Sequence, residues 1–147
     1  MRYKRQPHKS YVCGPVAVYN TLLYKYGKSD YSVRDLSNML HCKSISGTAT
    51  YRIRKFFRQN FVYVRKLKQL DKYIDAGHAL LLNYDNEHGG HYILIDKRTK
   101  DGYNCINDST LKTVKKRKRK TISKYLKCHI RQKAKVLVIK QWKVARV

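Results

Sequence analysis

Acidic residues are scarce in this sequence of 147 residues. Nine Asp and Glu stand against 34 Lys and Arg, the formal net charge is +25 at pH 7, and no acidic residue follows Asp108. A field of this size attracts polyanions such as nucleic acid, an anionic membrane surface or an acidic protein. The charge alone does not identify the partner, because a solvated basic loop has the same composition.

Long apolar runs and closely spaced cysteines are also missing. No stretch approaches the roughly 20 apolar residues that span a bilayer. No apolar segment with a small-residue cleavage site follows the basic residues near the start. We therefore expect no membrane span and no secretion signal, and a location in the cytoplasm or inside a virus or phage particle. The four cysteines have no C-x-x-C spacing, which indicates free thiols in a reducing compartment.

What is present fits a small globular protein. The hydrophobic content of 42% suits a soluble chain that buries its own core. No repeat and no Pro- or Gly-rich linker divides the sequence. We expect a single domain over residues 1–147, with a basic loop at about 112–120.

The hydrophobic period changes along the chain. Helical spacing and capping signals predict helices in the first half, with one short strand at 61–64; these helices are 13–26, 32–40, 50–59 and 67–76. Apolar runs of strand length follow, together with one further short helix at 124–130; these strands are 79–84, 91–96, 102–106 and 135–139. The pattern predicts an α+β fold in which N-terminal helices pack on an antiparallel β-sheet.

Cys13 opens the first predicted helix and is followed by Gly14 and Pro15. Unpaired N–H groups and the positive end of the helix dipole stabilise a thiolate there, which predicts a lowered pKa and a nucleophilic cysteine. Gly14 would leave space for a substrate carbonyl. The alternative is a small buried core cysteine.

A nucleophilic cysteine needs a general base, a residue that orients this base and a donor to the oxyanion, and the sequence offers a candidate for each. His91 follows two glycines at the start of a strand and suits a general base, whereas His88 has no strand behind it. A hairpin of 91–96 and 102–107 would bring Asp108 beside His91, to accept from its ring N–H and fix the tautomer. Gln6, seven residues before Cys13, can donate to an oxyanion together with the Cys13 backbone N–H.

Four segments of the chain together resemble a known family. They are Gln6, the run Cys13-Gly14-Pro15-Val16-Ala17 with Asn20, the run Gly90-His91-Tyr92-Ile93-Leu94-Ile95, and Asn107-Asp108-Ser109. In order and spacing this set resembles the papain-like cysteine peptidases that process bacteriocin leaders at a double glycine, and their stand-alone relatives, over roughly residues 6–141. Gln6 lies one residue further from the cysteine than is usual there.

The resemblance implies a papain-like fold and a cysteine peptidase. In this family Cys13, His91 and Asp108 would be catalytic, Gln6 would serve the oxyanion, and a peptide or protein would be cleaved through an acyl-enzyme without a metal or organic cofactor. Adjacent His and Cys pairs in this chain also lack the spacing of zinc ligands.

Two alternatives stay open. The first is a basic, nucleic-acid-associated or virus- or phage-particle protein that uses a papain-like scaffold. Its polyanion contacts would come from the basic run Lys115, Lys116, Arg117, Lys118, Arg119 and Lys120. The second is a deamidase or amide transferase that uses the same residues on a protein substrate.

Overall fold

A computed structural model describes residues 2–7, 11–43, 47–86, 89–109, 111–128 and 132–141. Three helices come first in the chain: α1 (Cys13–Tyr26), α2 (Val33–Met39) and α3 (Thr50–Phe57). The elements that follow are β1 (Val62–Tyr63), α4 (Leu67–Asp75), β2 (Ala79–Asn86), β3 (Gly89–Arg98), β4 (Gly102–Ile106), β5 (Val114–Lys118), α5 (Arg119–Lys127) and β6 (Lys135–Ile139). The α+β class expected from the sequence is confirmed.

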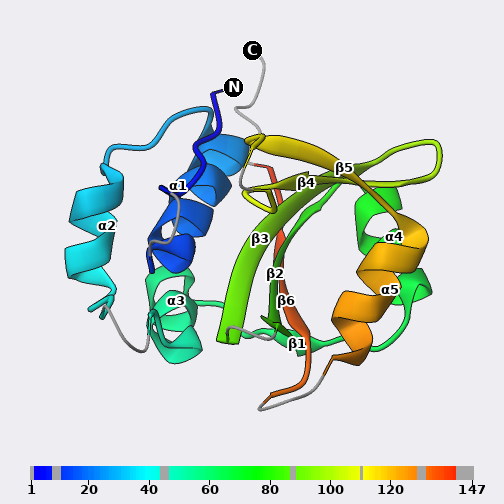
Figure 1. Ribbon diagram of the computed structural model, residues 1–147. Coiled ribbons are helices and arrows are strands. Elements are labelled where there is room, and N and C mark those ends of the chain that lie inside the picture. The colour runs from blue at the N-terminus through cyan, green and yellow to red at the C-terminus, as the bar shows by residue number, and fades with distance from the viewer. Residues whose placement is uncertain are drawn as a thin grey trace.

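The strands form one antiparallel sheet that lies between two groups of helices. Its strand order is β1-β6-β2-β3-β4-β5. Figure 1 shows α1, α2 and α3 on one side of this sheet and α4 and α5 on the other. None of the described helices combines the length and the apolar character that a bilayer crossing requires.

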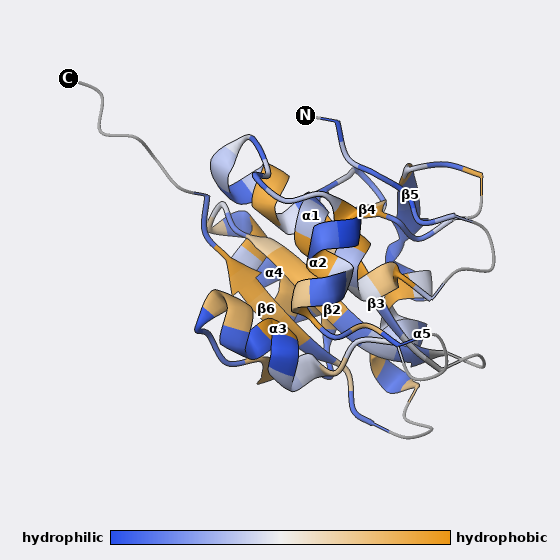
Figure 2. Cartoon of the chain, turned by 90° about the vertical axis from the view of Figure 1, so that its left-hand side faces the viewer, coloured by the Kyte–Doolittle hydropathy of each residue, from blue (hydrophilic) through white to orange (hydrophobic). Residues whose placement is uncertain are grey.

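Each face of the sheet has its own hydrophobic core, because successive side chains of a strand point to opposite faces. On β3, Tyr92 and Leu94 pack with α1, whereas Ile93 and Ile95 pack with α4 and α5. Figure 2 shows the apolar residues concentrated on the central strands and polar residues on the outer helices. The central strands are therefore covered on both faces, and their ends are the places where polar side chains can gather.

Local signals set several element ends where the sequence predicts them. Gly27 ends α1 in the left-handed conformation, at φ 79°. Ser32 and Asp35 form a reciprocal capping box at the start of α2. The predicted bounds of α1, β4 and β6 agree with the structure.

The basic segment differs from the expected loop. Residues 114–118 form the edge strand β5, and the next residues begin α5 well before the predicted start of that helix. Strand β4 supplies the backbone partners, and Gly102 permits the pairing, since a Cβ there would lie 1.9 Å from the carbonyl oxygen of Arg117. A lysine-rich strand is well suited to a sheet edge, where like charges discourage pairing with another chain.

Candidate active site

Two buried asparagines fix the N-terminal segment against the body of the protein. Asn20 on α1 bonds both the N–H and the carbonyl of Lys4, each at 2.8 Å. Asn107, which follows β4, accepts from the Gln6 N–H at 2.8 Å and donates to the Gln6 side-chain oxygen at 2.9 Å. The oxygen end of the Gln6 amide therefore faces Asn107, and Nε2 is the end that can donate elsewhere.

Cys13 lies half-buried in the first turn of α1, beside the start of β3. Burial raises the pKa of its thiol above the ordinary value, while hydrogen bonding from the backbone N–H groups of Tyr92, Gly14 and Cys13 itself opposes this rise. The net direction is opposite to the lowered pKa that the helix position predicts, because desolvation of the sulfur outweighs the helix terminus.

Gly14 serves packing rather than an open approach to the sulfur. A Cβ at this position would lie 2.6 Å from both Cβ and Oγ1 of Thr48, the residue two before α3. Thr48 is held in turn by the Tyr92 hydroxyl, which donates to its carbonyl at 2.8 Å. The glycine lets the first turn of α1 contact the chain that leads into α3.

His91 is bound through one ring nitrogen to the backbone after β4. Its Nε2 lies 3.1 Å from the carbonyl oxygen of Asn107. A carbonyl can only accept, so Nε2 is the protonated nitrogen and Nδ1 has the lone pair. Burial lowers the pKa of His91, although the charge of Asp108 and the bond to Asn107 act to raise it. The neutral imidazole is thus a proton acceptor through Nδ1.

Asp108 is buried within a separate network. Its carboxylate accepts from the Tyr84 hydroxyl at 3.1 Å, the Tyr125 hydroxyl at 2.8 Å and Arg117 Nε at 2.9 Å. Arg117 Nη2 also donates to the Asp108 carbonyl. Tyr84 stacks on Tyr125 at 4.2 Å and meets the His91 ring edge-on at 5.8 Å. The charge of Asp108 acts on His91 across this aromatic group, while the hydrogen bond of the imidazole goes to Asn107.

The residues that the sequence singles out thus lie together at one end of the sheet, and the structure adds three further residues to this group. Gln6 and His91 meet at Asn107, and Cys13 meets the residue after His91. No role for Asn107 was expected from the sequence, although it lies in one of the four segments of the resemblance, and neither Tyr84 nor Tyr125 was singled out. Of these, Asn107 had a signal, since it lies directly before Asp108 at a strand end and asparagine tolerates the left-handed backbone (φ 65°) found there.

Other expected site residues have different surroundings. Within the basic run, Arg117 pairs with Asp108 and Arg119 pairs with Asp71 at 3.0 Å, so these two cations already have carboxylate partners in the same chain. The remaining members of the run are lysines, and Lys116, Lys118 and Lys120 are exposed. His88, the competing base, lies outside the described residues. In the described ranges, no group of three His, Cys, Asp or Glu is placed to hold a metal ion.

Comparison with known proteins finds no matching family model and no matching curated protein. Among solved structures, the chain is similar to the peptidase domain of Streptococcus ComA, a bifunctional ABC transporter involved in a quorum-sensing pathway. The TM-score is 0.68 at 14% sequence identity, over 95% of this chain and 100% of that chain. This likeness confirms the expected papain-like α+β fold, and the chemistry of the chain has to be argued from its own residues.

Proposed function

We propose that this protein is a cysteine hydrolase that cleaves a peptide or amide bond through an acyl-enzyme at Cys13. The observation that carries the proposal is the hydrogen bond of His91 Nε2 to the Asn107 carbonyl. This bond selects the tautomer in which Nδ1 is the base, and the same Asn107 holds Gln6. One residue thus orients both the general base and the oxyanion donor.

The reaction follows from the protonation states. Burial raises the pKa of Cys13 and lowers that of His91, so thiol and imidazole are both neutral at rest. His91 takes the thiol proton as sulfur attacks the carbonyl carbon. The Gln6 amide and the Cys13 backbone N–H stabilise the oxyanion. The imidazolium then gives its proton to the leaving amine.

Water completes the cycle. His91, neutral again, removes a proton from a water molecule that attacks the thioester carbonyl. The carbon–sulfur bond breaks, the acid product leaves, and the proton returns to the Cys13 thiolate. The role expected for Asp108 within this scheme is electrostatic, because its charge raises the pKa of His91 and stabilises the imidazolium that forms.

A peptide-library experiment tests the proposal. Wild type, Cys13→Ala and the matched control Cys128→Ala are incubated with a proteome-derived peptide library, and the products are read by mass spectrometry. We expect new peptide ends with wild type and Cys128→Ala, and none with Cys13→Ala. Conversion of Gln to Glu without cleavage would show a deamidase. Equal product patterns in all three samples would refute a catalytic Cys13.

A further inference from the structure

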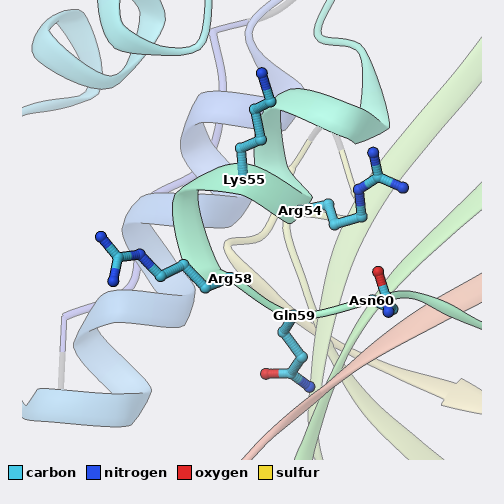
Figure 3. A pocket seen from close by; sticks show the side chains of 5 residues that line it. All are labelled: Arg54, Lys55, Arg58, Gln59 and Asn60. Atoms are coloured by element: carbon cyan, nitrogen blue, oxygen red, sulfur yellow. The ribbon is translucent and has the colours of Figure 1, made fainter.

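A pocket of 340 Å³ lies at the carboxyl end of α3, and none of its lining residues belongs to the candidate active site. It is lined by Arg54, Lys55, Arg58, Gln59 and Asn60 (Figure 3). Three of these side chains are cations and two are amides, and none is acidic. The lining therefore offers hydrogen-bond donors and positive charge, which suits an anionic ligand.

The positive charge of this α3 pocket is not neutralised from within the described part of the protein. The ion pairs there use other cations, namely Lys28, Arg98, Arg117 and Arg119. Lys135 on β6 is a further cation near the pocket, and burial together with the charge of Arg54 lowers the pKa of its ammonium group. Like charges held close together cost free energy, and a bound anion would offset that cost.

The backbone at the pocket is also unusual. Arg58, the C-cap of α3, adopts the left-handed conformation at φ 53°. This conformation is unfavourable for a residue with a side chain, and glycine normally occupies it. The helix end would be more stable with glycine, so the guanidinium at this position points to a use for the charge.

An aromatic ring lies on the same face of α3 as one of the cations. Tyr51 and Lys55 follow i, i+4 spacing, which places them along one side of the helix, and Arg58 follows as its C-cap. The Tyr51 side chain is exposed, and Lys55 Nζ lies 6.0 Å from its ring centroid. An exposed aromatic ring beside a row of cations is the combination that binds single-stranded nucleic acid, through base stacking and phosphate contacts.

We propose that the α3 pocket binds the phosphate backbone of single-stranded nucleic acid. Arginine guanidinium groups give paired hydrogen bonds to phosphate oxygens. The Asn60 amide is a further donor in the lining, whereas Gln59 Nε2 already donates to the Val138 carbonyl at 2.6 Å. The basic run of β5 is the weaker candidate, because Arg117 and Arg119 are already paired with carboxylates. The site is independent of the hydrolase chemistry and would hold the protein on a polyanion while Cys13 acts elsewhere.

Fluorescence anisotropy with a labelled single-stranded DNA of about 20 nucleotides tests this site. The variant is Arg54→Gln, Lys55→Gln, Arg58→Gln. The matched control is Lys116→Gln, Lys118→Gln, Lys120→Gln, which removes the same charge from the basic run. We expect the α3 variant to bind about tenfold more weakly or worse, with a salt slope smaller by about two. The control should stay within about threefold of wild type.

Three results would overturn the proposal: equal losses in both variants, no DNA binding by wild type, or loss of binding to phosphatidylserine vesicles with DNA binding retained. Lysine acetylation of the wild-type complex, read by mass spectrometry, provides a second test that needs no variant. DNA should protect Lys55 more than Lys116 or Lys118. Protection confined to the β5 lysines would assign the contact to the basic run and contradict an α3 site.

Discussion

Asn107 uses its backbone and its side chain for different parts of the site. Its carbonyl accepts from His91, its side chain pairs with Gln6, and its own N–H donates to the Thr113 carbonyl at 2.9 Å. The residue is buried and left-handed, with φ 65°. A substitution here therefore affects the proposed base, His91, and the proposed oxyanion donor, Gln6, separately, depending on which group it removes.

Asn107→Gly separates the two functions of this residue. Glycine keeps the carbonyl and tolerates the positive φ, but it removes the side-chain bonds to Gln6. We expect a slower acylation of Cys13 by p-nitrophenyl acetate than in wild type, with the dependence on His91 retained.

Gln6→Ala, which deletes the proposed donor itself, should lower the rate of this acylation by about 100- to 1000-fold. A wild-type rate in Gln6→Ala would exclude Gln6 from the oxyanion site.

The sequence indicates the identities of the site residues better than their contacts. Strand-end positions lead directly to His91 and Asp108, and the predicted hairpin does form. The sequence does not reveal that a backbone carbonyl accepts the hydrogen bond from the imidazole N–H, because this contact depends on the left-handed backbone at Asn107. Partners of Asp108 such as Tyr84 and Tyr125 come from β2 and α5, and no local pattern joins those elements.

The edge strand β5 carries two kinds of basic residue. Lys116 and Lys118 are exposed, whereas Lys115 and Arg117 are partly buried, as expected for alternate faces of a strand. Only Arg117 meets a buried carboxylate, and the Asp108 side chain is 5% exposed. Strand β5 therefore contains one buried ion pair, and the alternation of its side chains rather than its composition distinguishes Arg117 from the exposed lysines.

Arg117→Gln should destabilise the fold far more than changes at its neighbours. It leaves the buried Asp108 carboxylate without its cation, which typically costs about 3 kcal/mol or more. The exposed controls Lys116→Gln and Lys118→Gln should each change the free energy of unfolding by less than about 0.5 kcal/mol. Urea unfolding at neutral pH measures all three variants. Equal small losses across the strand would mean that the Arg117–Asp108 pair does not stabilise the protein.

The accuracy of the predicted elements follows from how local their signals are. A glycine stop and a capping box lie within a few residues of the helices that they bound, so α1 and α2 are predicted closely. Strand β5 depends on Gly102 and β4 for its backbone partners, and Arg119 at the start of α5 depends on Asp71 of α4. Such long-range partners are invisible in a window of sequence, which explains why a loop was expected there.

At the scale of the whole molecule, the excess of positive charge works against the compact state. The chain has a net charge of +25 and a surface of 9411 Å². Within the described ranges, the ion pairs found use Lys28, Arg98, Arg117 and Arg119, a small share of the cations. Repulsion between exposed charges is screened by salt, with a Debye length near 10 Å at about 0.1 M. The two hydrophobic cores must therefore stabilise the fold against a repulsion that depends on the solvent.

Added salt should therefore stabilise this protein. We expect the thermal midpoint to rise as sodium chloride increases from about 20 to about 300 mM, by several degrees, because screening removes repulsion in the folded state more than in the expanded one. Calorimetry measures the midpoint. Arg54→Gln, Lys55→Gln, Arg58→Gln should show a smaller rise, since the variant begins with less repulsion. A midpoint that falls with salt would mean that attractive ion pairs dominate.

The proposed hydrolase depends most directly on one pair of residues, Cys13 and His91. In the proposed mechanism the neutral imidazole is the base. Its pKa lies below the ordinary value of 6.5, while the pKa of the thiol lies above 9.0. The pH dependence of Cys13 acylation distinguishes a base-assisted thiol from a thiol that reacts only after ionising.

The decisive measurement is the rate at which p-nitrophenyl acetate acetylates Cys13 between about pH 5 and 10, in wild type and in His91→Ala. Peptide mass spectrometry locates the acetyl group on Cys13. We predict that the wild-type rate rises through a pKa below 6.5 and is level at neutral pH. In His91→Ala it should stay low until the pH approaches the raised thiol pKa, above 9.0. Superimposable profiles for the two proteins would show that His91 does not act on Cys13 and would contradict the proposed hydrolase.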